Sequence, residues 1–178
     1  MISEIKYLVL QKRYKYNLSV EENLAEGYIN GQNIGVVSNM RYGLCRMGFN
    51  GCESIALYNA MLYLGKKTQL TFIALYMERY KMLMGILGCN PYRISRALTR
   101  YGIGYMPKEC IDNNGAYIIS FWTGRRMMSS IHTVFARAYD DGLEIYNLYN
   151  NSPDTHRFST CSEFIGKGRI ILIYQLEK

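Results

Sequence analysis

The sequence has little of what would place a protein in a class at once. Among its 178 residues there are two histidines, three prolines and one tryptophan, and the five cysteines form no CxxC pair. An odd number of cysteines argues against a disulfide framework, and the missing CxxC pair argues against a zinc knuckle. We therefore expect reduced cysteines, no metal and no other cofactor.

Long apolar runs are absent as well. The longest, such as residues 168–174, are far shorter than the roughly 20 residues that a helix needs to cross a bilayer. The first fifteen residues carry charges on both sides of a short apolar run, with no small-residue cleavage site after it. These features predict a protein without a membrane span or an export signal, located in the cytoplasm.

The charge is basic but dispersed. A net charge of +7 suggests acidic partners, yet the basic residues stand in short separated groups. This distribution argues against nucleic-acid binding, which favours one basic patch or stripe. The charge does not indicate an oligomeric state. The groups are residues 12–15, 66–67, 93–100 and 125–126.

The chain changes its apolar period once, without a linker between the two parts. Apolar residues fall at helical spacing over about 52–101, and in short runs bounded by turn signals over about 103–178. Helices followed by strands indicate a single α+β domain over residues 1–178. Residues 1–45 are harder to assign: Ile5–Leu10 is typical of a strand, and Gly27–Gly35 of turns.

Three helices are predicted in the first part. The first begins at or just before Cys52 and ends before Gly65. The second has Thr68 as its N-cap, and the third has Asn90 as its N-cap, with a proline in its first turn. Their expected ranges are 52–64, 68–84 and 90–101.

The second part predicts four strands, two of which form a hairpin. Asp140, Asp141 and Gly142 stand between two alternating apolar segments, which is the pattern of a tight turn. The flanking strands should therefore be antiparallel neighbours. The four predicted strands are 116–122, 131–139, 143–149 and 169–176.

Cys52 is the candidate nucleophile because it stands where a buried helix begins. The helix end stabilises a thiolate by about 0.3 to 1 kcal/mol, less than the 1.36 kcal/mol that one pKa unit requires. The charge of the neighbouring Glu53 opposes the thiolate. Reactivity at neutral pH therefore needs a cationic histidine. With one, Cys52 should be the cysteine that is alkylated fastest at pH 7.

His132 is the candidate base, since it begins the first hairpin strand. Asn147, near the end of the second, follows Leu143 and Ile145 at period 2, and its amide can orient an imidazole. We expect the Cys52 sulfur within about 4 to 5 Å of one His132 nitrogen, and the Asn147 amide near the other. A strict hairpin register favours Asn150 as the orienting residue instead. His156, the other histidine, falls in a turn region and is expected on a surface loop.

Several segments together resemble the papain-like cysteine peptidases. The stretch GFNGCESIALYNAMLYLG is similar to their nucleophile helix, and GAYIISFWT with SSIHTVFARAYDDGLEIYNLYN to their histidine strand and its neighbours. The helix NPYRISRALTRYGI occupies the expected place between them. The nearest families are the bacterial bacteriocin-processing (double-glycine leader) peptidases and the butirosin-type acyltransferases. Over residues 45–150 the resemblance implies a papain-like fold with Cys52 as nucleophile, His132 as general base and acid, and Asn147 as orienting residue.

The sequence departs from this family at the oxyanion donor. Members usually place a glutamine six residues before the cysteine, where this chain has Arg46. The Cys52 amide could act with Asn50 or Arg46, and loss of one donor typically costs about 10²- to 10³-fold in rate. The expected activity is hydrolysis of a peptide or isopeptide bond. The alternatives are acyl transfer from an acyl donor to an amine, and a binding domain that has the fold without catalysis.

Overall fold

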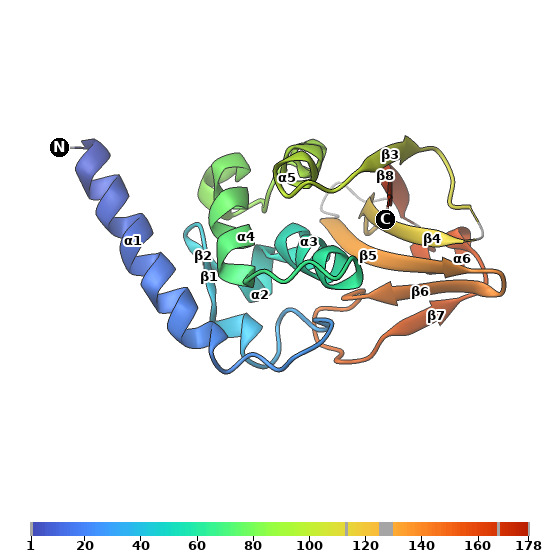
Figure 1. The fold of residues 1–178 in the computed structure, drawn as a ribbon, viewed down its shortest axis with the longest axis horizontal. Helices are drawn as coiled ribbons and strands as arrows, with labels where there is room; N and C mark the ends of the chain where they lie inside the picture. The colour runs from blue at the N-terminus through green and yellow to red at the C-terminus, as the bar shows by residue number, and fades with distance from the viewer. Residues whose placement is uncertain (1, 113, 125–129, 167, 178) are drawn as a thin grey trace.

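A computed structural model of the chain describes residues 2–112, 114–124, 130–166 and 168–177. Helices occupy much of the first hundred residues, and an antiparallel sheet follows (Figure 1). The α+β order predicted from the change of period is confirmed. No helix in the described part of the chain is long and apolar enough to span a membrane.

Six strands form the main sheet, and each pair of neighbours is antiparallel. The hairpin prediction is confirmed, because Tyr139 pairs with Gly142 across the turn. The ranges predicted for two strands, 131–139 and 169–176, match the structure. In sheet order the strands are β3 (Tyr105–Lys108), β8 (Arg169–Leu176), β4 (Gly115–Trp122), β5 (Ile131–Tyr139), β6 (Gly142–Tyr146) and β7 (His156–Phe158). The short edge strands β3 and β7 were not predicted.

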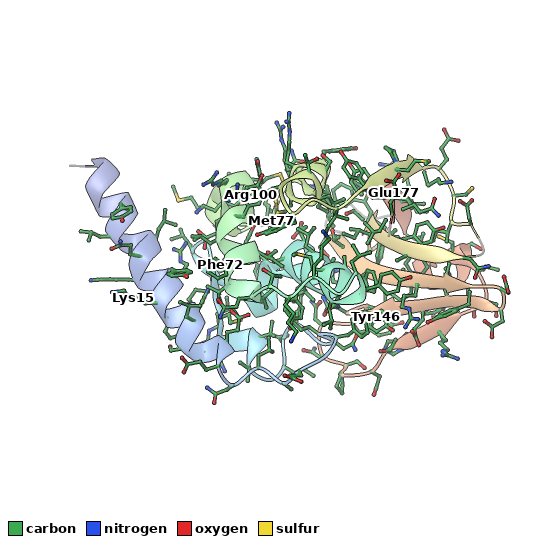
Figure 2. All side chains as sticks on the ribbon, in the orientation of Figure 1. Lys15, Phe72, Met77, Arg100, Tyr146 and Glu177 are labelled. Carbon is green, nitrogen blue, oxygen red and sulfur yellow. The ribbon has the colours of Figure 1, made fainter. Side chains whose placement is uncertain are left out.

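The sheet separates two apolar cores. Because side chains alternate along a strand, Phe135 of β5 faces the helix α3 (Cys52–Tyr63), whereas Val134 faces the other side. Tyr146 of β6 packs in the core with Phe135 and α3 (Figure 2). The second core is closed by Phe164 of the short helix α6 (Cys161–Ile165). The predicted first helix is therefore confirmed, and it is buried as expected.

The other predicted helices were partly right. Asn90 caps as predicted, accepting a hydrogen bond from the Tyr92 amide at 3.0 Å before the 3₁₀ turn Pro91–Arg93 leads into α5 (Ile94–Arg100). The second helix, α4 (Leu70–Met77), is shorter than predicted and does not use Thr68 as its cap. Its first amides instead donate to the carboxylate of Glu21, with the Thr71 amide at 2.9 Å. This cap comes from another helix, so local sequence could not indicate it.

The expected strand at Ile5–Leu10 was wrong. The segment belongs to α1 (Ile2–Glu21), which extends away from the rest of the molecule (Figure 1). A short apolar run does not by itself distinguish a strand from a helix. The helix is attached near its end by Asn17, whose amide exchanges hydrogen bonds of 2.7 and 2.9 Å with the Arg41 backbone.

A two-stranded ribbon completes the helical half. It consists of β1 (Arg41–Tyr42) and β2 (Cys45–Arg46), with Gly43 and Leu44 between them. The chain then passes through the single turn α2 (Met47–Asn50) to Cys52.

The first prediction concerns Asn59, a fully buried residue of α3 that fixes the loop before the ribbon. Its side chain accepts from the Ile29 amide at 2.8 Å and donates to the Ile29 carbonyl at 2.9 Å. Asn59→Ala should lower the free energy of unfolding by about 3 kcal/mol, because two buried backbone groups lose their partners. Urea unfolding followed by circular dichroism measures the change. In the exposed control Asn23→Ala the change should stay below about 0.5 kcal/mol, and equal effects would contradict this role.

Candidate functional site

Buried polar side chains gather where α3 begins and β6 ends. They come from four distant parts of the sequence, and each is at most 7% exposed. Burial of so many polar groups costs free energy unless each has a partner. Their partners therefore indicate how the site is built. The residues are Gln32, Cys52, Glu53, His132 and Asn147.

Asn147 holds the centre of this cluster through an unusual backbone conformation. Its φ of 59° lies in the left-handed region, which asparagine tolerates better than most residues, and β6 ends just before it. The Asn147 amide N–H donates to Asn30 at 2.7 Å. Its side chain accepts from the Gln32 backbone at 3.0 Å and donates to the Gln32 side chain at 3.2 Å. The side-chain amide is thus committed to Gln32.

His132 is oriented by Asn147, but not by the predicted group. The His132 Nε2 lies 2.7 Å from the backbone carbonyl oxygen of Asn147. A carbonyl only accepts, so Nε2 carries the proton and Nδ1 is the nitrogen without one. The expectation that the Asn147 side chain orients His132 is therefore corrected. The reason is geometric: the left-handed turn directs the backbone carbonyl of Asn147 to the histidine and its side-chain amide to Gln32.

The alternative residues do not take this role. The last pair of the β5–β6 ladder is Phe135 with Tyr146, so Asn150 lies beyond it. The Asn150 carbonyl accepts from the Asn33 amide at 2.8 Å. His156 stands in β7, where its ring contacts Tyr149 at 4.7 Å between centroids.

Cys52 lies against the same stretch of β5. Because β6 ends opposite Phe135, the edge of β5 that precedes Phe135 is not covered by β6. The Cys52 sulfur faces the backbone N–H of Thr133 there, one residue from His132. The His132 ring itself turns to the other face of the sheet and meets Phe121 edge-on at 5.9 Å. The Cys52 and His132 side chains therefore lie on opposite faces of β5.

The sulfur is bonded to a carboxyl group rather than to the imidazole. Cys52 Sγ donates to Glu53 Oε2 at 3.3 Å, and within the described residues no hydrogen bond joins the sulfur to His132. Glu53 Oε1 accepts from the Cys89 amide at 3.4 Å. The expected contact between thiol and imidazole is therefore not formed in this conformation.

Burial sets the protonation of all three groups. It raises the pKa of Cys52 well above its ordinary value, and the adjacent Glu53 raises it further, while the Thr133 amide partly offsets both. Burial also raises the pKa of Glu53 to about 7 and lowers the pKa of His132, the latter opposed by its backbone hydrogen bonds. The resting state at neutral pH is a thiol beside a neutral imidazole. This corrects the expectation of a thiolate stabilised by a histidine cation.

Of the two side chains proposed as oxyanion donors, one is bonded to another loop and the other is exposed. Asn50 donates to the carbonyl of Ile86 at 2.9 Å and to that of Gly85, which fixes a neighbouring loop. Arg46 is exposed at the end of β2.

Gln32 is the side chain that the sequence did not reveal. Its Nε2 donates at 3.2 Å to the carbonyl of Gly48, in the turn that leads to Cys52. A glutamine among glycines and asparagines reads as a turn residue, so nothing in the local pattern marked it. In the described part of the chain, no three histidine, cysteine or acidic side chains gather in a way that could hold a metal ion.

Comparison with known proteins does not assign the chain to a family. No protein-family model matches the chain, and no curated protein matches it. The roles of Cys52, His132 and Asn147 therefore depend on their geometry and on the resemblance of the segments around them.

The second prediction follows from the raised pKa of Glu53. A carboxyl group with a pKa near 4.5 unfolded and about 7 folded binds its proton more tightly in the folded state. The contribution of Glu53 to the free energy of unfolding is therefore fully present below about pH 4.5. It falls by about 3 kcal/mol as the pH rises to about 7. Glu53→Gln should flatten this dependence in urea unfolding at pH 5, 6 and 7.5. The exposed control Glu22→Gln should leave the slope unchanged, and a wild-type protein without the slope would refute the assignment.

The third prediction corrects the expected order of cysteine reactivity. Cys110 is exposed whereas Cys52 is buried with a raised pKa. Iodoacetamide at pH 7 should therefore label Cys110 first, as peptide mapping by mass spectrometry can show. Glu53→Gln removes the charge that disfavours the thiolate, and should increase the rate at Cys52 about tenfold. An unchanged Cys52 rate would show that Glu53 does not control this thiol.

Proposed function

We propose that the chain is a papain-like cysteine enzyme that transfers an acyl group from a peptide, isopeptide or thioester donor to water or an amine. The observation that supports this function best is the buried polar cluster in which the Cys52 sulfur faces the Thr133 amide, one residue from His132, while the imidazole is held by Asn147. The order of Cys52, His132 and Asn147 along the chain and their helix and strand contexts agree with the family that the segments resemble. The Asn147 carbonyl serves in place of its side chain as the group that orients the imidazole.

The reaction begins with proton transfer. The proton of Cys52 passes to Nδ1 of His132 while the sulfur attacks the carbonyl carbon of the donor. The Nε2 proton stays on its hydrogen bond to Asn147, which stabilises the imidazolium. When the tetrahedral intermediate collapses, the bond to the leaving amine or thiol breaks, and the leaving group takes the proton from Nδ1. Cys52 is then an acyl thioester.

The second half restores the enzyme. Water or an amine gives a proton to Nδ1 as it attacks the thioester carbonyl, and the sulfur leaves as the proton returns to it. Hydrolysis and acyl transfer differ only in this acceptor.

For this chemistry the sulfur must leave Glu53 and turn to the imidazole. The hydrogen bond to Glu53 at 3.3 Å holds the thiol in its resting position. Because the imidazole lies on the other face of β5, the reaction also requires a rearrangement that brings Nδ1 of His132 and the sulfur together.

The fourth prediction tests the enzyme directly. Wild-type protein incubated with a panel of acyl thioesters should gain the acyl mass on Cys52, seen by intact and peptide mass spectrometry. Cys52→Ala should remove this adduct, and His132→Ala should slow its formation about 10²- to 10⁴-fold. Cys110→Ala is the matched control and should acylate Cys52 at the wild-type rate.

One observation favours a second function, a binding domain with the papain-like fold but no catalysis. The thiol is bonded to a buried carboxyl group, Asn50 is bonded to a neighbouring loop, and Arg46 is exposed to solvent. If acyl mass appears only on Cys110, and His132→Ala changes nothing, the binding domain replaces the enzyme.

A further inference from the structure

Two loops beside the start of α3 present large apolar side chains to solvent. One is the turn between β1 and β2 with the following α2, and the other is the loop over residues 82–88, which contains the 3₁₀ turn Leu83–Gly85. Six side chains on these loops, here called the apolar tips, are between 52% and 67% exposed. They are Leu44, Phe49, Leu83, Met84, Ile86 and Leu87.

The two loops form one unit through their backbones. The Leu44 amide donates to the Met84 carbonyl at 3.0 Å, and Gly43 lies so close to Met84 that a side chain there would collide with it. Asn50 binds the same loop at Ile86. The apolar tips are therefore held together on a fixed frame.

The conformation of the second loop is costly. Leu83 and Met84 have φ values of 44° and 57°, in the left-handed region that residues with side chains seldom adopt. Both side chains are about two-thirds exposed, so no burial in the described structure offsets this cost. Strain that keeps apolar groups in water indicates that they are buried elsewhere, against another surface.

The two loop segments that carry the tips contain basic residues and no acidic ones. Segments 41–50 and 81–90 contain three basic residues, Arg41, Arg46 and Lys81, and no acidic residue. Arg41 and Arg46 are opposite each other in the backbone pairing at the base of the β1–β2 turn. Lys81 forms a backbone β-bridge with Cys89 at the base of the other loop. Lys81 is paired with the Glu78 carboxylate at 3.2 Å, so the basic base is supplied by Arg41 and Arg46 under the β1–β2 turn.

This pattern matches an anionic lipid surface. Apolar side chains that protrude enter the boundary between headgroups and acyl chains, while basic residues below them meet the negative headgroups. A second copy of the chain fits less well, because an isologous contact would bring the same arginines together without an acidic partner. We infer that the apolar tips dock the protein on an anionic membrane surface as a peripheral, non-spanning protein.

Vesicle sedimentation tests this inference. Wild-type protein should pellet with vesicles of phosphatidylcholine containing 30% phosphatidylserine, and much less with phosphatidylcholine alone or in 0.5 M salt. The double variant Leu83→Ser, Met84→Ser should reduce the partition coefficient for these vesicles about tenfold or more. Arg46→Gln should reduce it severalfold by removing one headgroup contact.

The control is Met106→Ser, which removes an apolar side chain that is 49% exposed on the edge strand β3, far from the β1–β2 ribbon (Figure 1). It should pellet as the wild type does, and circular dichroism should show all variants folded. Failure of the wild type to bind anionic vesicles would overturn the inference. So would binding that the tip variants leave unchanged, or self-association in size-exclusion chromatography that the tip variants abolish while vesicles stay unbound. None of these results depends on whether Cys52 is catalytic.

Discussion

The left-handed backbone of Asn147 is the constraint on which the candidate site depends. It ends β6 early, and this leaves the edge of β5 open where Cys52 enters. It also directs the backbone carbonyl of Asn147 to His132 and its side-chain amide to Gln32. Asn147 therefore joins His132 to the loop that contains Asn30 and Gln32.

Glu53 determines the resting chemistry of the site. A carboxyl group buried next to a thiol keeps the proton on sulfur, since a second negative charge in a buried place is costly. The neutral imidazole has the same origin, because burial disfavours its cation. The thiol is therefore unreactive in this resting state, and the proposed enzyme becomes active only when the thiol leaves Glu53.

The apolar tips lie close to this site along the chain and in space. The loop of residues 82–88 is bound by Asn50, two residues before Cys52, and Gly88 of the same loop packs near the Glu53 carboxyl oxygens. An event at the tips is thus connected by direct contacts to the residue that holds the thiol. If both proposals hold, docking would place the start of α3 near the lipid surface, where a donor carried on a membrane would arrive.

Elements whose signals are local could be predicted from the sequence. Helical periodicity after Cys52, the cap at Asn90, and the turn between two alternating segments all act within a few residues, and the structure has each of them. The candidate residues Cys52, His132 and Asn147 could also be chosen from their order and their elements. Which of them are in contact, Asn147 with His132 but not Cys52 with His132, appears only in the packed chain.

The partners and protonation of these groups depend on contacts between distant segments. The cap of α4 comes from Glu21 on another helix, and the partner of the Asn147 amide comes from Gln32 in a stretch that resembles turns. The pKa of Glu53 rises because the surrounding helices and loops exclude water from it, which no local pattern records. Local sequence specifies backbone preference, whereas burial and long-range hydrogen bonds arise only when distant segments pack together.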